Sequence, residues 1–326
     1  MPTRSQHSLH SPHPDEEVRS LDDGEGHSEL LLGAGDAPLK QPEFGRFTAS
    51  DGYRLRFRHW RPDCDRPRGY VVALHGIQSH SGWYLHSSSR LCELGFDVRF
   101  LDRRGSGLNE AERGHAVHHD RLVNDVTSFL AHTRYEARGN SPASAIILLS
   151  VSWGGKLAAV TAARRPELID ALALLYPGIC AKLSVRPHQQ LGLWLADRLG
   201  VSRRLCPIPL DDPALFTGQP QWQEYIRKDT LALRRASVGF LKASLALDRE
   251  ASRAPERIVS PVLLMLAGRD RITDNDATIR YFNRFASSDP TLIEYPEAEH
   301  TLEFEPDRER FIADLCDWVE SIGTAS

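Results

Sequence analysis

One short segment restricts what this chain can fold into more than any other. A continuous apolar run, Ala145–Leu149, leads into Ser150-Val151-Ser152-Trp153-Gly154-Gly155, and a helical pattern follows. A buried strand that passes through small residue, x, Ser, x, Gly into a helix is typical of a nucleophile elbow, which holds the serine hydroxyl at the edge of a sheet. We therefore expect Ser152 to be a nucleophile. The backbone N–H of Trp153 is expected beside the reacting carbonyl, at a helix N-terminus.

The rest of the chain alternates between strand-like and helical patterns. Apolar residues recur at helical spacing from Leu122 to Leu130 and from Phe311 to Val319. Such alternation predicts an α/β fold with a mostly parallel, doubly wound sheet that is covered on both faces. The predicted strands are Tyr70–Leu74, Asp97–Leu101, Ala145–Leu149, Ala171–Tyr176, Val262–Leu266 and Leu292–Tyr295, after a hairpin of Arg46–Ser50 and Tyr53–Trp60 around Asp51-Gly52.

This alternation divides the chain into four segments. Residues 1–44 are rich in polar residues, Pro and Gly, which predicts a flexible tail. Residues 45–178 and 256–326 are the two parts of the core. Residues 179–255 show no strand-like run, so we expect an all-helical lid over the ends of the strands. The expected lid helices are Leu191–Leu199, Gln221–Ile226 and Leu231–Leu245.

Composition and charge favour a cytoplasmic protein. The 326-residue chain has a formal net charge of −4, so neither nucleic acid nor an anionic membrane surface is expected as a partner. No apolar run approaches the ~18 residues of a bilayer-spanning helix, and residues 1–13 lack the apolar stretch of a signal peptide. Five scattered cysteines favour reduced thiols over a zinc site or a disulfide framework. These patterns leave the oligomeric state unknown.

Acyl transfer through a serine also needs a base and a carboxylate that orients the base. On an elbow of this kind the chain order is Ser, acid, His. One predicted strand ends at the loop that holds Asp270, and the last strand leads to His300, so we predict these two residues as acid and base. Asp274 and Asp276 compete for the acid, although Asp274 suits the N-cap of a helix over Ala277–Phe285.

The loop after the first predicted core strand supplies a donor for the tetrahedral oxyanion. The sequence there is His75-Gly76-Ile77-Gln78. Because glycine permits a sharp turn, the N–H of Ile77 is expected to point to the same place as that of Trp153. We therefore predict an oxyanion hole of Ile77 and Trp153. No metal ion or organic cofactor is required.

Other chemistry-bearing residues favour structural roles. His115, His118 and His119 lack the H-E-x-x-H spacing of a zinc site, so solvent-exposed or capping roles are expected. Gly105-Ser106-Gly107 lacks the third glycine and the acidic residue of a dinucleotide fingerprint. Arg103-Arg104 are expected to hold their loop through backbone carbonyls.

Three motifs resemble the α/β-hydrolase family, and more narrowly its monoacylglycerol lipase and lysophospholipase branch. Leu74–Tyr84 (LHGIQSHSGWY) resembles the oxyanion loop of that branch, and Leu101–His115 (LDRRGSGLNEAERGH) is similar to its D-x-R-G-x-G-x-S segment, with Asn109 where Ser is usual. Leu266–Asp274 (LAGRDRITD) resembles its acid loop, whose first Asp is the triad member. The resemblance spans about residues 45–322 and is weak across the lid.

This resemblance implies a serine esterase of the lipase-like type. His300 would deprotonate Ser152, an acyl-enzyme would form, and water activated by His300 would release the acid. An apolar lid favours a lipophilic acyl group, such as that of a monoacylglycerol or lysophospholipid, although the lid residues also suit a small core of their own. The family has glycine two residues before the nucleophile. Ser150 stands there in this chain, so we expect some strain in the elbow.

Three alternatives stay open. A peptidase or amidase similar to the proline iminopeptidases would need lid carboxylates for a substrate amine, and Asp211, Asp212 and Glu224 are the candidates. An acyltransferase would pass the acyl group to an acceptor other than water. A non-catalytic interaction protein would keep the fold without the chemistry, which the complete set of predicted catalytic residues disfavours.

Overall fold

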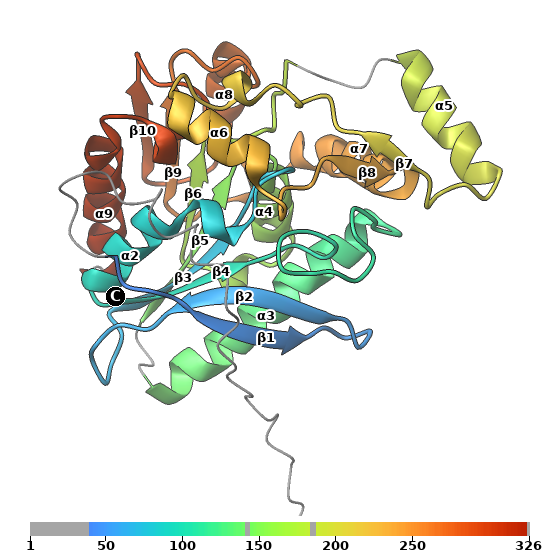
Figure 1. Cartoon of the computed structure of the whole chain (residues 1–326). Coiled ribbons are helices and arrows are strands. Elements are labelled where there is room, and N and C mark those ends of the chain that lie inside the picture. Colours follow the sequence, from blue (N-terminus) through green and yellow to red (C-terminus); the bar gives the residue numbers. More distant parts are fainter. Residues whose placement is uncertain (1–38, 141–143, 183–186, 325–326) are drawn as a thin grey trace, which may run out of the picture.

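Eight strands form one sheet at the centre of the molecule (Figure 1). In the computed structural model, which describes residues 39–140, 144–182 and 187–324, their order is β1-β2-β4-β3-β5-β6-β9-β10. β2 runs antiparallel to both neighbours, and the other neighbours are parallel. The predicted α/β class and mostly parallel sheet are thus confirmed. The strands are β1 (Glu43–Thr48), β2 (Arg54–Trp60), β3 (Gly69–Leu74), β4 (Phe96–Leu101), β5 (Ala145–Val151), β6 (Ala171–Leu175), β9 (Val262–Ala267) and β10 (Pro290–Tyr295).

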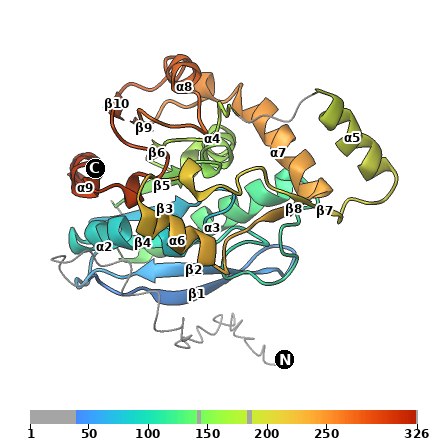
Figure 2. The ribbon, with the colours of Figure 1, turned by 45° about the horizontal axis from the view of Figure 1, so that its top comes forward.

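Helices cover both faces of this sheet. α2 packs beside α9 on one face, and α3 packs beside α4 on the other (Figures 1 and 2). Because both faces are covered, every residue of β3, β5, β6 and β9 is buried, as expected for central parallel strands. The helices outside the lid are α2 (Leu85–Glu93), α3 (His119–Asn140), α4 (Gly154–Arg164), α8 (Asn275–Phe282) and α9 (Arg308–Thr324), with short 3-10 turns η1 (Ser81–Trp83), η2 (Pro166–Leu168), η4 (Pro255–Arg257) and η5 (Leu302–Phe304).

The chain between β6 and η4, which we call the lid, is mainly helical. The expectation that it is entirely helical is wrong, because two short strands pair antiparallel within it. Three-residue strands are too short to show an alternating pattern, so the sequence gives little sign of them. The elements of the lid are α5 (Pro187–Arg198), β7 (Leu205–Pro207), η3 (Pro213–Leu215), α6 (Pro220–Lys228), β8 (Arg235–Ser237) and α7 (Val238–Ala251).

The helix predicted over Leu231–Leu245 begins later than expected. Its first turn starts at Val238, because the Ser237 hydroxyl accepts a hydrogen bond from the N–H of Phe240 and caps the helix. Arg235–Ser237 form β8 instead, and residues 231–234 lie in the loop before this strand.

One lid helix lies at the edge of the molecule. α5 lies to one side in both ribbon views and contacts lid helix α7 (Figures 1 and 2). Leu191, Trp194 and Leu195 on this helix are exposed apolar residues. None of the helices in the described ranges is both long and apolar enough to pass through a bilayer.

The ordered core begins earlier than the predicted boundary after residue 44. β1 starts at Glu43, and Lys40 is already anchored, because its carbonyl accepts from the Trp60 indole N–H at 2.9 Å. The predicted hairpin of β1 and β2 is confirmed, and Gly52 occupies the left-handed region in its turn with φ of 83°. The remainder of the predicted tail, residues 1–38, lies outside the described residues.

Candidate active site

Loops at the carboxyl ends of three parallel strands bring a serine, a histidine and an aspartate together. Ser152 follows β5, Asp270 follows β9 and His300 follows β10. The Ser152 hydroxyl donates to His300 Nε2 at 2.9 Å, and His300 Nδ1–H donates to Asp270 Oδ2 at 2.7 Å. The carboxyl ends of parallel strands are where sites form in open α/β sheets. This hydrogen-bonded row has the geometry that nucleophilic catalysis by serine requires.

The turn that carries Ser152 is a sharp one. Ser152 has a φ of 51°, in the left-handed region that is costly for a residue with a side chain. Its N–H donates to the Leu175 carbonyl at 3.1 Å, and its carbonyl accepts from Gly155 at 2.9 Å, so strand and helix hold the turn from both sides. Gly154 has no room for a side chain, because a Cβ there would lie 2.8 Å from the His75 carbonyl oxygen.

Ser150 fits the elbow through a hydrogen bond. Its side chain is fully buried in β5, where its hydroxyl donates to the Ala173 carbonyl on β6 at 3.3 Å. This bond satisfies the hydroxyl inside the sheet. The positive φ lies at Ser152 itself.

Aromatic rings enclose the imidazole of His300, whose residue is only 1% exposed. The Tyr176 ring lies 5.1 Å from it on one side, and the Phe216 ring of the lid lies at 6.0 Å. Tyr176 also has a positive φ, 37°, at the end of β6. Sequence reasoning missed Tyr176 as a site residue. The Tyr-Pro-Gly sequence that ends a predicted strand was the available signal.

Asp270 is held as a carboxylate. Its Oδ1 accepts from the N–H groups of Ile272 and Thr273 at 2.7 and 2.9 Å. Burial acts to raise the pKa of Asp270, but His300 and these two donors outweigh it, so the pKa lies below its ordinary value. An ionised Asp270 can support a protonated imidazole.

The two competing aspartates serve helix α8 instead. Asp274 is the N-cap, and its carboxylate accepts from the N–H of Ala277 at 2.9 Å, as the sequence predicted. Asp276 lies in the first turn, where a negative charge favours the helix.

The loop after β3 passes directly against Ser152. A Cβ added at Gly76 would lie 3.2 Å from the Ser152 Cβ. The Gly76 N–H donates to the Ser79 hydroxyl at 2.9 Å, which tightens this loop. In the described part of the chain, the N–H groups of Ile77 and Trp153 have no acceptor. Free N–H groups beside a serine hydroxyl can receive an oxyanion.

A buried carboxylate of the lid accepts hydrogen bonds from side chains of this same loop. Asp229, just after α6, accepts from the Trp83 indole N–H at 2.6 Å and from His80 Nε2–H at 3.1 Å. Burial acts to raise its pKa, but these donors and the Leu231 N–H outweigh it and lower the pKa of Asp229 to about 2. Sequence reasoning missed this contact, because 149 residues separate Asp229 from His80.

The two neighbouring arginines of the next loop differ in role. Arg103 Nη2–H donates to the Ile77 carbonyl at 3.0 Å, which agrees with the sequence expectation. The expectation is wrong for Arg104, whose guanidinium binds both carboxylate oxygens of Asp125 at 2.8 Å.

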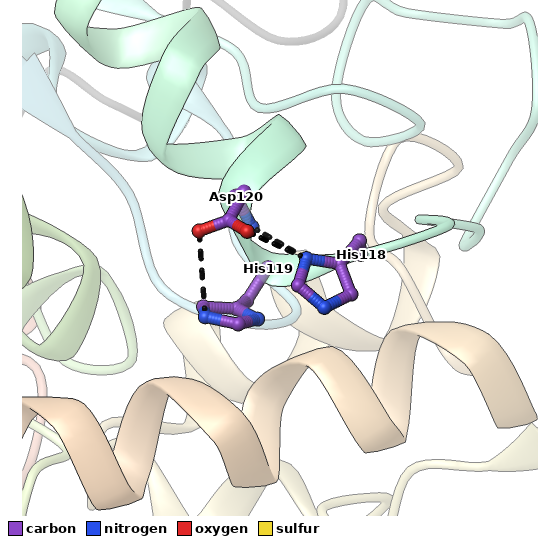
Figure 3. Close-up of side chains that lie close together, drawn as sticks. All are labelled: His118, His119 and Asp120. Atoms are coloured by element: carbon purple, nitrogen blue, oxygen red, sulfur yellow. Dashed lines mark hydrogen bonds and ion pairs between the residues drawn. The ribbon is translucent and has the colours of Figure 1, made fainter.

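One group of potential metal ligands occurs in the described ranges. His118, His119 and Asp120 offer ligand atoms within 4.8 Å of one another at the start of α3 (Figure 3). The Arg164 guanidinium already donates to Asp120 at 2.7 Å and to Glu250 on α7 at 2.6 Å. A metal ion would have to compete with this fixed positive charge. His115, the third histidine considered from the sequence, bonds instead to the Ser237 hydroxyl at 2.8 Å.

Comparisons with known proteins agree with the fold. The family described as "Serine aminopeptidase, S33" matches residues 65–307. A monoacylglycerol lipase of Mycolicibacterium smegmatis is 26% identical over 276 residues, which cover 84% of this chain and 96% of the relative. The human monoglyceride lipase is 28% identical over 259 residues, which cover 78% of this chain and 82% of the relative.

Solved structures show the same architecture. The crystal structure of Paleococcus ferrophilus monoacylglycerol lipase superposes with a TM-score of 0.73 at 24% identity, covering 82% of this chain and 99% of that one. A soluble variant of monoglyceride lipase from Saccharomyces cerevisiae gives 0.76 at 17% identity, covering 89% and 99%. The family match spans most of the chain, from ahead of β3 to beyond the loop that carries His300. The chain therefore belongs to this family of α/β-hydrolases, in the branch that resembles the monoacylglycerol lipases.

Proposed function

We propose that this protein hydrolyses carboxylic esters through an acyl-enzyme on Ser152. The observation that carries the proposal is the row of hydrogen bonds from Ser152 through His300 to Asp270. Similarity to monoacylglycerol and monoglyceride lipases supports an ester as substrate. Ile77 and Trp153 supply the oxyanion donors.

The reaction runs in two halves. His300 Nε2 takes the proton of Ser152 as Oγ attacks the ester carbonyl carbon, and the carbonyl electron pair moves onto oxygen between the N–H groups of Ile77 and Trp153. Collapse of this intermediate breaks the ester bond, and His300 returns the proton to the departing alcohol. Water, deprotonated by His300, then attacks the acyl-enzyme, and the carboxylic acid leaves as Ser152 regains its proton. Asp270 stabilises the imidazolium in both halves.

The substrate carries a lipophilic acyl group, of the monoacylglycerol or lysophospholipid type. Support comes from the lid, where Phe216 lies against His300 and next to Trp83, at a ring distance of 5.7 Å. Other lid aromatics are used for packing, since Trp222 stacks on Phe304 and Phe240 stacks on Trp153. An apolar wall beside the base is suited to an alkyl chain.

The aminopeptidase alternative has less support, although the description of the family carries that word. A free carboxylate in the lid would have to bind the substrate amine. Glu224 pairs with Arg227 and Lys228, and Asp212 accepts from the N–H of Ala214 at 2.9 Å. Two of the three candidate carboxylates are therefore already engaged.

Two assays test the proposal. A fluorophosphonate probe should label the wild-type protein on Ser152 and should leave Ser152→Ala unlabelled. A series of p-nitrophenyl esters of increasing chain length should show turnover that rises from acetate towards longer acyl chains. Equal inactivity towards every ester, or faster turnover of aminoacyl-naphthylamides, would contradict ester hydrolysis.

The other expectations from the sequence stay predictions. The division into tail, two core parts and lid at residues 45, 179 and 256 is one of them, apart from the earlier start of the ordered core. The cytoplasm remains the expected location, and the five cysteines are unpaired. Water, rather than a second alcohol, is the proposed acceptor of the acyl group.

A further inference from the structure

One buried cation contacts both residues of the proposed oxyanion hole. Arg103 follows β4 and is only 7% exposed. Its Nη2–H donates to the Ile77 carbonyl at 3.0 Å. Its guanidinium carbon lies 4.8 Å from the ring centre of Trp153 and 4.8 Å from that of Phe240, on lid helix α7. The loop after β3, the turn at Ser152 and lid helix α7 therefore all contact the side chain of Arg103.

The positive charge of Arg103 is not neutralised by an ion pair. No described carboxylate lies within 4.0 Å of its guanidinium, and Nε and Nη1 are buried without an acceptor among the described residues. Its neighbour Arg104, in contrast, binds Asp125 with two nitrogens. Burial of an unpaired guanidinium is costly, and contact with ring faces offsets only part of that cost. Such a group is more expected at a functional site than in ordinary packing.

The backbone of Arg103 acts on the same loop. Its N–H donates to His75 Nε2 at 2.9 Å, so the proton of the neutral imidazole is on Nδ1, which donates to the Gly76 carbonyl at 2.8 Å. Burial lowers the pKa of His75 to about 3, which keeps the ring neutral. In a trans peptide the carbonyl and the following N–H point in opposite directions. Fixing the Gly76 carbonyl therefore fixes the direction of the Ile77 N–H.

We propose that Arg103 is a positioning residue for the oxyanion hole. Its backbone sets the peptide before Ile77 through His75, and its side chain holds the peptide after Ile77. The same guanidinium holds the Trp153 ring, whose indole N–H also donates to Ser244 on α7 at 2.9 Å. The buried charge adds a field that favours negative charge at the oxyanion. This inference rests on the proposed function.

The test compares a transition-state analogue with a ground-state analogue. A trifluoromethyl ketone with the acyl chain of a good substrate accepts Ser152 Oγ and forms a tetrahedral oxyanion, whereas the matching alcohol only fills the acyl site. In Arg103→Met we expect kcat to fall about 10- to 100-fold with KM nearly unchanged, less than the loss of a whole donor. The inhibition constant of the ketone should rise by the same factor, and that of the alcohol should not change. Arg103→Lys, which keeps the charge, should recover part of the loss.

Arg113→Met is the matched control. This arginine belongs to the same loop, but its guanidinium donates to the carbonyls of Gly107 and Leu231. The Arg113→Met substitution should lower thermal stability and leave the ketone-to-alcohol ratio of inhibition constants unchanged. The inference is overturned if the inhibition constants of ketone and alcohol rise by the same factor in Arg103→Met and in Arg103→Lys while both variants are normally folded. Arg103 would then have only a packing role. Activity that persists in Ser152→Ala would instead overturn the proposed function.

Discussion

At the scale of single residues, the elbow shows how a departure from the family pattern is accommodated. The family has glycine where this chain has Ser150. Ser150 lies inside β5, where its hydroxyl finds the Ala173 carbonyl of the adjacent strand. The backbone strain belongs to Ser152, with its φ of 51°. The sequence predicts which residues stand at the turn, but the partner of Ser150 depends on strand pairing, which no local pattern encodes.

The two serines should therefore respond differently to substitution. Ser152→Ala should abolish ester hydrolysis, because no other hydroxyl lies against His300 Nε2 in the described residues. Ser150→Gly should keep activity within a few-fold of the wild type and lose about 1 kcal/mol of unfolding free energy with the buried hydrogen bond. Ester turnover and urea unfolding of both purified variants check this. Full activity in Ser152→Ala would refute the assignment.

Asp270 and Asp274, four residues apart, give a second pair of opposite expectations. Asp270→Asn keeps an acceptor for Ile272 and Thr273 but favours the wrong tautomer of His300, so kcat should fall by about ten-thousand-fold, the scale known for such substitutions. Asp274→Ala removes only the cap of α8 and should cost about 1 kcal/mol of stability with kcat retained. Steady-state kinetics measure kcat of both variants, and thermal melts measure their stability. A larger kcat loss in Asp274→Ala would reverse the two roles.

At the scale of elements, strands could be predicted better than their lateral contacts. Each predicted core strand is present, and the central strands β3, β5, β6 and β9 could be predicted because a fully buried parallel strand is a continuous apolar run. The β7–β8 pair could not be predicted, since three residues carry no period. The contact between Asp229, just after α6, and the loop after β3 joins residues far apart in the chain, and no recognised motif includes Asp229. Long-range polar contacts of this kind could not be predicted from the sequence.

The contact between Asp229 and the loop after β3 predicts that the stability of the protein depends on pH. Asp229 has a pKa lowered to about 2, against an ordinary value of 3.8. A lowered pKa stabilises the fold above the unfolded value, and the contribution is lost as pH falls towards the folded value. Asp229→Asn should therefore be less stable than the wild type by about 2 kcal/mol at pH 6. The difference should be roughly half as large at pH 3.

Urea unfolding of both proteins between pH 3 and pH 7 measures this difference. Asp276→Asn, on the exposed first turn of α8, is the control, because it removes one negative charge without touching the contact between lid and core. A constant difference between wild type and Asp229→Asn across this range would show that the lid contact does not depend on the charge of Asp229.

At the scale of the whole molecule, lid and core are joined along one helix pair. α7 of the lid packs on α4 of the core, beside the elbow. Arg164 on α4 binds Glu250 on α7 and Asp120 on α3, so three elements from distant parts of the chain share one guanidinium. The sequence predicts the helices but not this joint, because it depends on how the lid folds back.

This joint also explains why three potential ligands need not bind a metal. His119 Nε2 lies 3.5 Å from Asp120, and His118 Nδ1 lies 3.0 Å from Asp120 (Figure 3). Glu250 lies 3.5 Å from His119 Nε2. Two histidines and two carboxylates are ligands that zinc accepts. The Arg164 guanidinium donates to both carboxylates and also lies 3.5 Å from His119 Nε2. Removal of Arg164 should therefore leave Asp120 and Glu250 free to bind a metal ion together with His118 and His119.

Arg164→Met tests both roles. Without zinc, the variant should lose about 1 kcal/mol of stability, as for a partly exposed ion-pair network, and the loss should shrink in high salt because the charges are screened. With micromolar zinc, its melting temperature should rise, whereas that of the wild type should not. Adding His119→Ala to Arg164→Met should remove the zinc effect. An equal rise in the wild type would show that the guanidinium does not block the site, and the cluster would then be a metal centre of the native protein.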